Sequence, residues 1–150
     1  MNLPVHHTAG VLIECNDRFV LVVKKFNNRL DIPCGHIEFN EDTRTAAIRE
    51  TKEETFIDLR PERIVELGEW EHIEEDSDSG VPFADGRHIH KSHIFFCRMK
   101  SLPPMIASGD SKDIKILTLD ELERFSKKML DSAIGAFELL KRRGFKAMLA

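Results

Sequence analysis

The sequence predicts an α/β protein in which a mixed β-sheet carries helices on its faces. Two observations support this class. Short apolar and β-branched runs typical of strands alternate along the chain with stretches whose apolar residues have helical spacing. The chain has 150 residues, of which 41% are hydrophobic, a length that suits one domain with a single core. We therefore expect residues 1–150 to form a single domain.

Charge and cysteine content exclude several classes of function. The formal net charge is -4 at pH 7 and the charged residues are well mixed, so we expect no nucleic-acid polymer as a partner. No apolar run approaches the roughly 20 residues that span a bilayer, and no signal-peptide pattern is present. We expect a cytoplasmic monomer or homodimer without a membrane partner. The three cysteines form no CxxC pair, which predicts reduced thiols.

The first strands are expected to form a hairpin. Residues 9–14 and 18–25 are rich in β-branched and apolar side chains. Asn16 and Asp17 lie between them, and both residue types are common in tight turns.

A shaped loop and a helix are expected to follow. Pro33 cannot donate a hydrogen bond within a sheet, and Gly35 permits unusual backbone dihedrals, so the chain leaves the sheet here. Asp42 or Thr43 can cap a helix that runs to about Thr55.

The second half is expected to supply three strands and two helical stretches. The strands are expected at residues 63–73, 88–99 and 113–119, and the first helical stretch begins with residues 120–125. Four apolar residues then fall at helical spacing and predict the face of the last helix that packs on the sheet: Leu130, Ile134, Phe137 and Leu140.

The first helix carries an unusual set of carboxylates. Glu50, Glu53 and Glu54 are three and four positions apart and share one face, where Ala46 and Ala47 also project. The opposite side is expected to hold Ile48, Lys52 and Thr55. The acidic residues therefore coincide with small apolar positions rather than with a plainly solvated face.

These carboxylates call for a positive partner. Two unit charges about 6 Å apart repel by roughly 3 kcal/mol at an effective dielectric near 20. Arg49 can reach Glu53 but cannot neutralise three glutamates, whereas a hard divalent cation such as Mg²⁺ takes several carboxylates and bridges substrate phosphates. The alternative is a solvated surface helix in which Arg44, Arg49 and Lys52 are interleaved with the acids.

Residues Gly35 to Ile57 resemble the Nudix box, G-x5-E-x7-R-E-U-x-E-E-x-G-U, where U is a bulky aliphatic residue. The matching residues are Gly35, Glu41, Arg49, Glu50, Glu53, Glu54 and Ile57. Thr51 departs from the first aliphatic position, and Phe56 replaces the second glycine. A phenylalanine forced into a left-handed helix cap would cost on the order of 1 kcal/mol. Just upstream, Cys34 replaces a common glycine.

The resemblance implies an α/β/α sandwich that hydrolyses a nucleoside diphosphate linked to another group. It implies that Glu50, Glu53 and Glu54 hold Mg²⁺ or Mn²⁺, with the carbonyl of Cys34 as a further candidate ligand. It also implies that Arg49 orients the glutamates and that Glu41 supports the junction of loop and helix.

The family pattern leaves the group that activates water open. Glu53 or Glu50 is expected to bind or deprotonate the attacking water. A base from a later loop is the alternative, with Asp110 and Asp113 as candidates.

The compact length resembles nucleoside triphosphate pyrophosphohydrolases of the MutT type. ADP-ribose and nucleotide sugars are alternative substrates, and a non-catalytic nucleotide-binding module is the alternative function. Candidate contacts to substrate are Arg29, Trp70 and Phe83, with Phe26 as a further stacking candidate. Each of these residues also has a purely structural interpretation, as a core aromatic or a charge on an edge strand.

The segment 88–97 raises the question of zinc, because it contains His88, His90, His93 and Cys97. On a strand, the first two face one side and the last two face the other. One tetrahedral site built from these four is therefore not expected.

Overall fold

The computed structural model describes residues 3–75 and 87–144. These residues form one seven-stranded mixed sheet with the order β3-β2-β1-β6-β5, in which β4 pairs with β1 and β7 pairs with β2. The strands are β1 (Val5–Cys15), β2 (Arg18–Lys24), β3 (Leu30–Asp31), β4 (Cys34–His36), β5 (Val65–Glu74), β6 (His88–Arg98) and β7 (Ser111–Thr118). The α-helices are α1 (Thr43–Thr55), α2 (Leu119–Arg124) and α3 (Asp131–Arg143).

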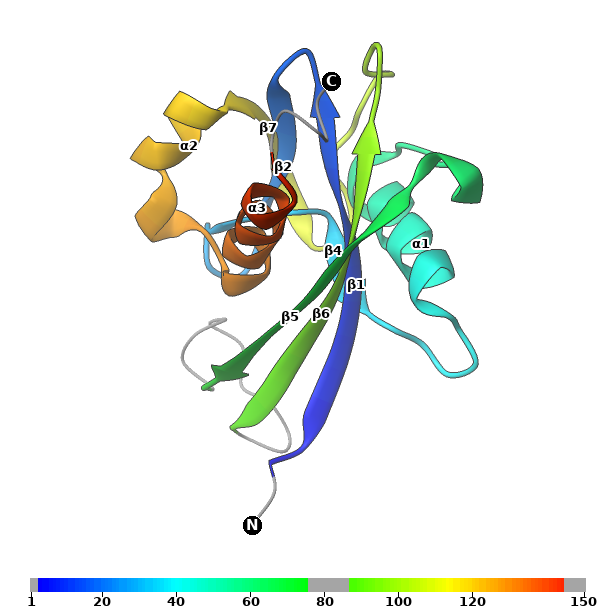
Figure 1. The fold of residues 1–150 in the computed structure, drawn as a ribbon, viewed down its shortest axis with the longest axis vertical. Coiled ribbons are helices and arrows are strands. Elements are labelled where there is room, and N and C mark those ends of the chain that lie inside the picture. The colour runs from blue at the N-terminus through cyan, green and yellow to red at the C-terminus, as the bar shows by residue number, and fades with distance from the viewer. Residues whose placement is uncertain (1–2, 76–86, 145–150) are drawn as a thin grey trace.

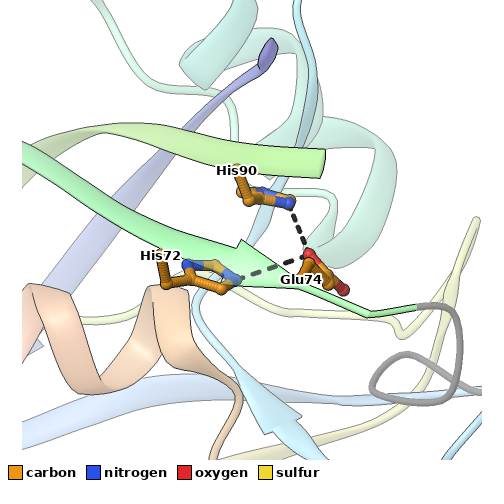
Figure 2. A group of neighbouring side chains, drawn as sticks. All are labelled: His72, Glu74 and His90. Carbon is orange, nitrogen blue, oxygen red and sulfur yellow. Dashed lines mark ion pairs between the residues drawn. The ribbon is translucent and has the colours of Figure 1, made fainter. Parts of the chain in front are cut away.

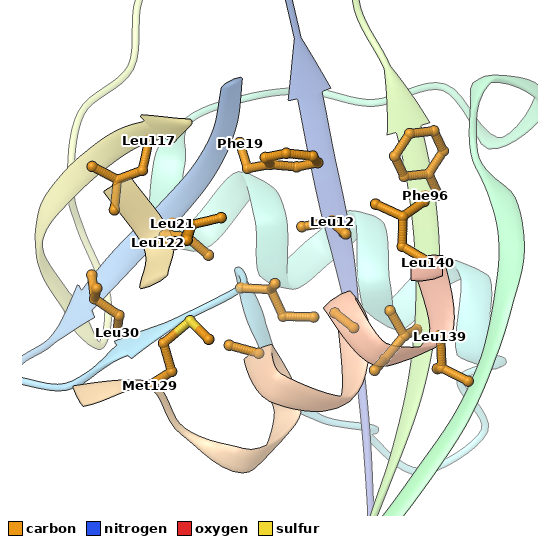
Figure 3. Packing of buried hydrophobic residues seen from close by; sticks show 14 of the residues in the cluster. Leu12, Phe19, Leu21, Leu30, Phe96, Leu117, Leu122, Met129, Leu139 and Leu140 are labelled. Atoms are coloured by element: carbon orange, nitrogen blue, oxygen red, sulfur yellow. The ribbon is translucent and has the colours of Figure 1, made fainter. Parts of the chain in front are cut away.

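Helices cover both faces of the sheet, with α1 on one side and α2 and α3 on the other (Figure 1). β1 runs parallel to β6 and antiparallel to β2 and β4, which makes the sheet mixed. Alternation along β1 supplies both cores, because Val11 and Ile13 pack on the α1 side while Leu12 packs on the α3 side. Figure 3 shows the α3-side core. The predicted fold class, an α/β/α sandwich, is confirmed.

The predicted hairpin is confirmed and joins β1 to β2. Cys15 pairs with Arg18, so Asn16 and Asp17 form a two-residue turn. Both turn residues have positive φ, 51° and 62°. Such left-handed conformations match the twist of the flanking strands, and asparagine and aspartate tolerate them better than most residues.

The helix α1 begins and ends where the sequence predicted. The Asp42 side chain accepts a hydrogen bond from the backbone N–H of Thr45 and caps the N-terminus. At the C-terminus, Phe56 has φ 66° and its N–H donates to the carbonyl of Lys52. The sequence analysis placed Thr55 on the side of the helix opposite Ala46 and Ala47, away from the buried face, and this was wrong. Thr55 is buried because it lies beside Ala47 and Thr51 on the packed face of the helix.

The last helix packs on the sheet through a face slightly rotated from the predicted one. Leu140 is fully buried as expected, but Ile134 and Phe137 lie at the edge of the contact. Small residues, including Gly135, occupy its centre, and a Cβ at Gly135 would lie 2.2 Å from Cγ of Trp70. The helix therefore approaches β5 closely. No helix in ranges 3–75 and 87–144 combines the length and hydrophobicity that a bilayer-spanning segment needs.

Candidate active site

Arg49 of α1 is the centre of an ion-pair network. Its Nε lies 2.7 Å from Glu41 Oε2, and its Nη1 lies 2.8 Å from Glu50 Oε1 and 3.1 Å from Glu53 Oε1. Nη2 also donates to the carbonyl of His36 over 3.0 Å. The guanidinium thus joins the β4 loop to three carboxylates. The hydrogen bond from Arg49 is the main reason why the pKa of Glu41 lies below its ordinary value.

Gly35 makes room for the Glu50 carboxylate. A Cβ at Gly35 would lie 2.2 Å from the carboxyl carbon and 2.4 Å from both oxygens of Glu50. No other residue type fits here without moving this carboxylate. Burial raises the pKa of Glu50, and the neighbouring Arg49 opposes that rise. Gly35 lies within β4, pairs with Ala9 of β1 and has no positive φ. The prediction that the chain leaves the sheet at Gly35 was therefore wrong, and the glycine of the motif is required here for steric reasons.

Glu54 is the most buried carboxylate of the helix. Its Oε1 accepts a hydrogen bond from the backbone N–H of Cys34 at 2.8 Å, and its Oε2 lies 2.7 Å from Lys24 Nζ. Burial raises the pKa of Glu54 to about 7, although Lys24 works in the opposite direction. The Lys24 ammonium also donates to the carbonyl of Cys34 over 3.3 Å. The sequence analysis did not place Lys24 beside Glu54.

The donor set fits a hard divalent cation. Glu50, Glu53, Glu54 and the Cys34 carbonyl offer only oxygen, the donor that Mg²⁺ and Mn²⁺ prefer. An ammonium already lies between two of these oxygens, those of Glu54 and Cys34, which shows that they favour a positive charge. A metal ion at these two oxygens would have to displace Lys24 or share them with it. Glu53 is half exposed, so its carboxylate is open to solvent.

A cavity of about 230 Å³ opens beside this network. Its wall includes Lys24, Cys34 and Gly35, together with the exposed ring of Phe26. Asp110 also lines this cavity. The side chain of Asp113 instead accepts a hydrogen bond from the backbone N–H of Ile114. Of the two later aspartates, Asp110 is therefore the better placed to act on a bound substrate.

The predicted substrate contacts are dispersed. Arg29 lines a neighbouring pocket of about 180 Å³ and donates to the carbonyl of Met129 over 2.9 Å. Trp70 packs against Gly135, and the guanidinium carbon of Arg142 lies 5.3 Å from its ring centre. This packing gives Trp70 a structural role, and its contact with substrate stays a prediction. Phe83 lies outside the described residues.

The histidines of β6 separate as the strand alternation predicted. His93 lies 3.1 Å from His7, and Cys97 is buried in the core on the α1 side. His90 instead joins His72 and Glu74 of β5 on the α3 side (Figure 2). The sequence analysis missed this group. The sequence held a signal for it: His72 and Glu74 are two residues apart in one predicted strand, His88 and His90 are two residues apart in the next, and residues two apart on a strand face the same side.

A family model described as the NUDIX domain matches residues 4–138. The chain therefore belongs to the NUDIX domain family, and the resemblance of residues Gly35 to Ile57 to the Nudix box is confirmed.

Three similar proteins show how far the likeness extends. The phosphatase NudJ of Escherichia coli is 30% identical over 67 residues, which cover 43% of this chain and 44% of NudJ. A bifunctional NMN adenylyltransferase/ADP ribose pyrophosphatase from Francisella tularensis, solved with AMP and a Mn ion, superposes with a TM-score of 0.73 at 26% identity, covering 94% of this chain and 42% of that one. A C. elegans Ap4A hydrolase has a TM-score of 0.66 at 21% identity and covers 95% of this chain and 98% of that one. The matches to the first two proteins span less than half of each.

Proposed function

We propose that the chain is a metal-dependent pyrophosphohydrolase that cleaves a nucleoside diphosphate linked to another group. The observation that carries this proposal is the network in which Arg49 holds Glu41, Glu50 and Glu53 beside a cavity. If α1 were only a solvated surface helix, the Glu50 carboxylate would not need to pack against Gly35 and Glu54 would not be buried. We further propose that residues 1–150 act as one Nudix domain.

The chain's own residues would divide the chemistry among them. Mg²⁺ or Mn²⁺, held by Glu50, Glu53, Glu54 and the Cys34 carbonyl, would neutralise the charge of the pyrophosphate. The Glu53 carboxylate is half exposed and forms an ion pair with Arg49, so we place it as the group that binds or deprotonates the attacking water. Arg49 keeps the carboxylates oriented, and Glu41 ties Arg49 to the loop by accepting the backbone N–H of Glu38.

The substrate is a nucleotide in every version of the proposal. A nucleoside triphosphate, cleaved to the monophosphate and pyrophosphate, is the first candidate. ADP-ribose is the second candidate, because the Francisella tularensis protein carries an ADP ribose pyrophosphatase activity in its name and covers nearly all of this chain. Dinucleoside polyphosphates are a third candidate substrate, because the C. elegans protein of similar fold is named an Ap4A hydrolase. Phe26, which is 62% exposed on the cavity wall, is the candidate for stacking on the base.

The test is hydrolysis of a nucleotide panel with Mg²⁺ or Mn²⁺. The panel contains nucleoside triphosphates, ADP-ribose, nucleotide sugars and dinucleoside polyphosphates, and product release is followed by chromatography. Glu53→Gln is expected to lower kcat by about 100-fold or more while the protein stays folded. Lys52→Gln, on the neighbouring exposed position, is the matched control and is expected to retain activity.

A second pair of variants addresses the later aspartates. Asp110→Asn is expected to reduce turnover if Asp110 is the base, and Asp113→Asn is its control. A folded wild-type chain that binds nucleotides and Mg²⁺ but hydrolyses no member of the panel would contradict the enzyme proposal. That result would favour the non-catalytic binding module.

A further inference from the structure

A second cluster of metal-type ligands lies on the α3 side of the sheet, outside the Nudix box. It consists of His72 and Glu74 of β5 and His90 of β6. His72 pairs directly with His90 in the antiparallel ladder, and Glu74 is two residues further along β5, so all three side chains project from the same face. Figure 2 shows both imidazoles directed at the Glu74 carboxylate.

The distances suit a tetrahedral ion. His72 Nε2 lies 3.4 Å from Glu74 Oε2, and His90 Nδ1 lies 2.6 Å from the same oxygen. Ligands about 2.0–2.2 Å from a tetrahedral metal ion are about 3.3–3.6 Å from one another. The first pair already has this spacing, and the second needs to open by less than about 1 Å. Asp131 Oδ2, 3.5 Å from His72 Nε2, is available as a fourth donor.

The hydrogen bonds of His90 favour a cation at this point. The Thr8 hydroxyl lies 3.2 Å from Ser92 Oγ and 3.1 Å from His90 Nε2, so it can donate to Ser92 and accept the Nε2–H of His90. In the neutral imidazole of this tautomer Nδ1 carries a lone pair, and this buried nitrogen makes no hydrogen bond within the described residues although Glu74 Oε2 lies 2.6 Å away. Two lone pairs at 2.6 Å repel unless a proton or a metal ion lies between them. Such a hydrogen bond to the distal nitrogen is also the usual way in which proteins orient a metal-bound histidine.

The surroundings favour a metal ion over a proton. A proton satisfies one nitrogen–oxygen pair, whereas here a second imidazole nitrogen, that of His72, converges on the same carboxylate oxygen. The side chain of Glu74 is only 9% exposed, and each imidazole is 15% exposed. A buried carboxylate in contact with two imidazoles is a set of nitrogen and oxygen donors that suits zinc and similar divalent transition metals more than Mg²⁺.

We propose that His72, Glu74 and His90 bind one divalent transition-metal ion of the zinc class, at a site separate from the Nudix-box carboxylates. Glu74 and His90 line the same 230 Å³ cavity as Cys34 and Gly35. The ion would therefore place a second positive charge on the wall of the cavity proposed for the substrate. It would also link β5 to β6 where both strands border the cavity.

The test uses the full chain and Co²⁺, whose visible absorption reports nitrogen ligands and tetrahedral geometry. Excess Mg²⁺ is added to fill the oxygen sites of the Nudix box, so that Co²⁺ reports on the histidine site. The titration is repeated in the Glu53→Gln variant, which lacks one of the Nudix-box carboxylates. Wild type is expected to bind one Co²⁺ with tetrahedral bands and to release it to one equivalent of Zn²⁺. His72→Gln and His90→Gln are each expected to weaken binding by about 100-fold or more, and Thr8→Val by about 10-fold.

His93→Gln is the matched control, because His93 lies on the same strand but faces the other side. It is expected to bind Co²⁺ as wild type does. Thermal unfolding verifies that each variant is folded. If a histidine variant fails this check, Thr8→Val tests the site instead, because it keeps both imidazoles. Equal Co²⁺ affinity in wild type and in folded His90→Gln would overturn the proposal. A spectrum without nitrogen ligation, or an equal loss in His93→Gln, would overturn it as well.

Discussion

The carboxyl carbon of Glu50 lies 2.2 Å from the position that a Cβ of residue 35 would occupy, so the glutamate can hold its place only because residue 35 is glycine. This relationship links the loop at β4 to the helix α1 through a steric requirement. It leads directly to a prediction about activity.

Gly35→Ala is expected to displace the Glu50 carboxylate and to lower kcat/KM by about 100-fold, since a shift of about 1 Å in a reacting group has an effect of this size. The melting temperature is expected to change little, because the flexible end of Glu50 can move aside. Steady-state kinetics and thermal unfolding together measure both effects. Gly144→Ala is the control for turnover alone: no atom lies within 4 Å of the added methyl, but the φ of 88° makes alanine strained, so the variant should lose about 1 kcal/mol of stability and keep its turnover. Full activity in Gly35→Ala would refute the prediction.

Lys24→Met is expected to destabilise the metal-free protein by about 3 kcal/mol, because it leaves the Glu54 carboxylate buried without its cation. Saturating Mg²⁺ should reduce this loss, since the ion can then take the place of the ammonium at Glu54 and the Cys34 carbonyl. Urea unfolding with and without Mg²⁺ measures the difference. Lys25→Met, at an exposed neighbour, should stay within about 0.5 kcal/mol of wild type. An equal loss with and without Mg²⁺ would show that the ion does not reach these oxygens.

The affinity for Mg²⁺ is expected to rise with pH through the neutral range. Burial raises the pKa of Glu54 to about 7, and a carboxylate must lose its proton before it binds metal. Below that pKa the proton competes, so affinity should increase by about tenfold per pH unit and then level off above about pH 8. Calorimetric titrations at about pH 6, 7 and 8 measure this dependence. In Glu54→Gln both the affinity and its pH dependence should fall, and an unchanged pH profile in that variant would assign the effect to another group.

The sequence was sufficient to predict those features that depend on spacing within one element or on a turn. The positions of Glu50, Glu53 and Glu54 follow from helix geometry, and the turn at Asn16 and Asp17 follows from their tolerance of positive φ. The orientation of α1 on the sheet was harder, because Thr55 packs inward through a hydrogen bond from its hydroxyl to the carbonyl of Thr51. Hydrophobic periodicity alone does not reveal that a threonine hydroxyl can be buried because it donates a hydrogen bond to a helix carbonyl.

Contacts between distant segments were not accessible in this way. Lys24 and Glu54 are 30 residues apart, and their ion pair depends on where the fold places the end of β2 relative to α1. The group of His72, Glu74 and His90 depends on the register between β5 and β6, in which His72 lies opposite His90. A shift of one residue in that register would place the imidazoles on opposite faces of the sheet.

Phe56 provides a test of backbone strain at the point where the chain departs from the Nudix box. Its φ of 66° lies in the left-handed region, where a side chain costs about 1 kcal/mol relative to glycine, and its ring is 55% exposed and contributes limited burial. Phe56→Gly is therefore expected to be more stable than Phe56→Ala by about 1 kcal/mol, because both variants lose the ring but only glycine relieves the strain. Denaturant unfolding of the two variants measures this difference. If alanine proved as stable as glycine, the strain would be absent in solution, and the end of α1 would have to be reshaped around the phenylalanine.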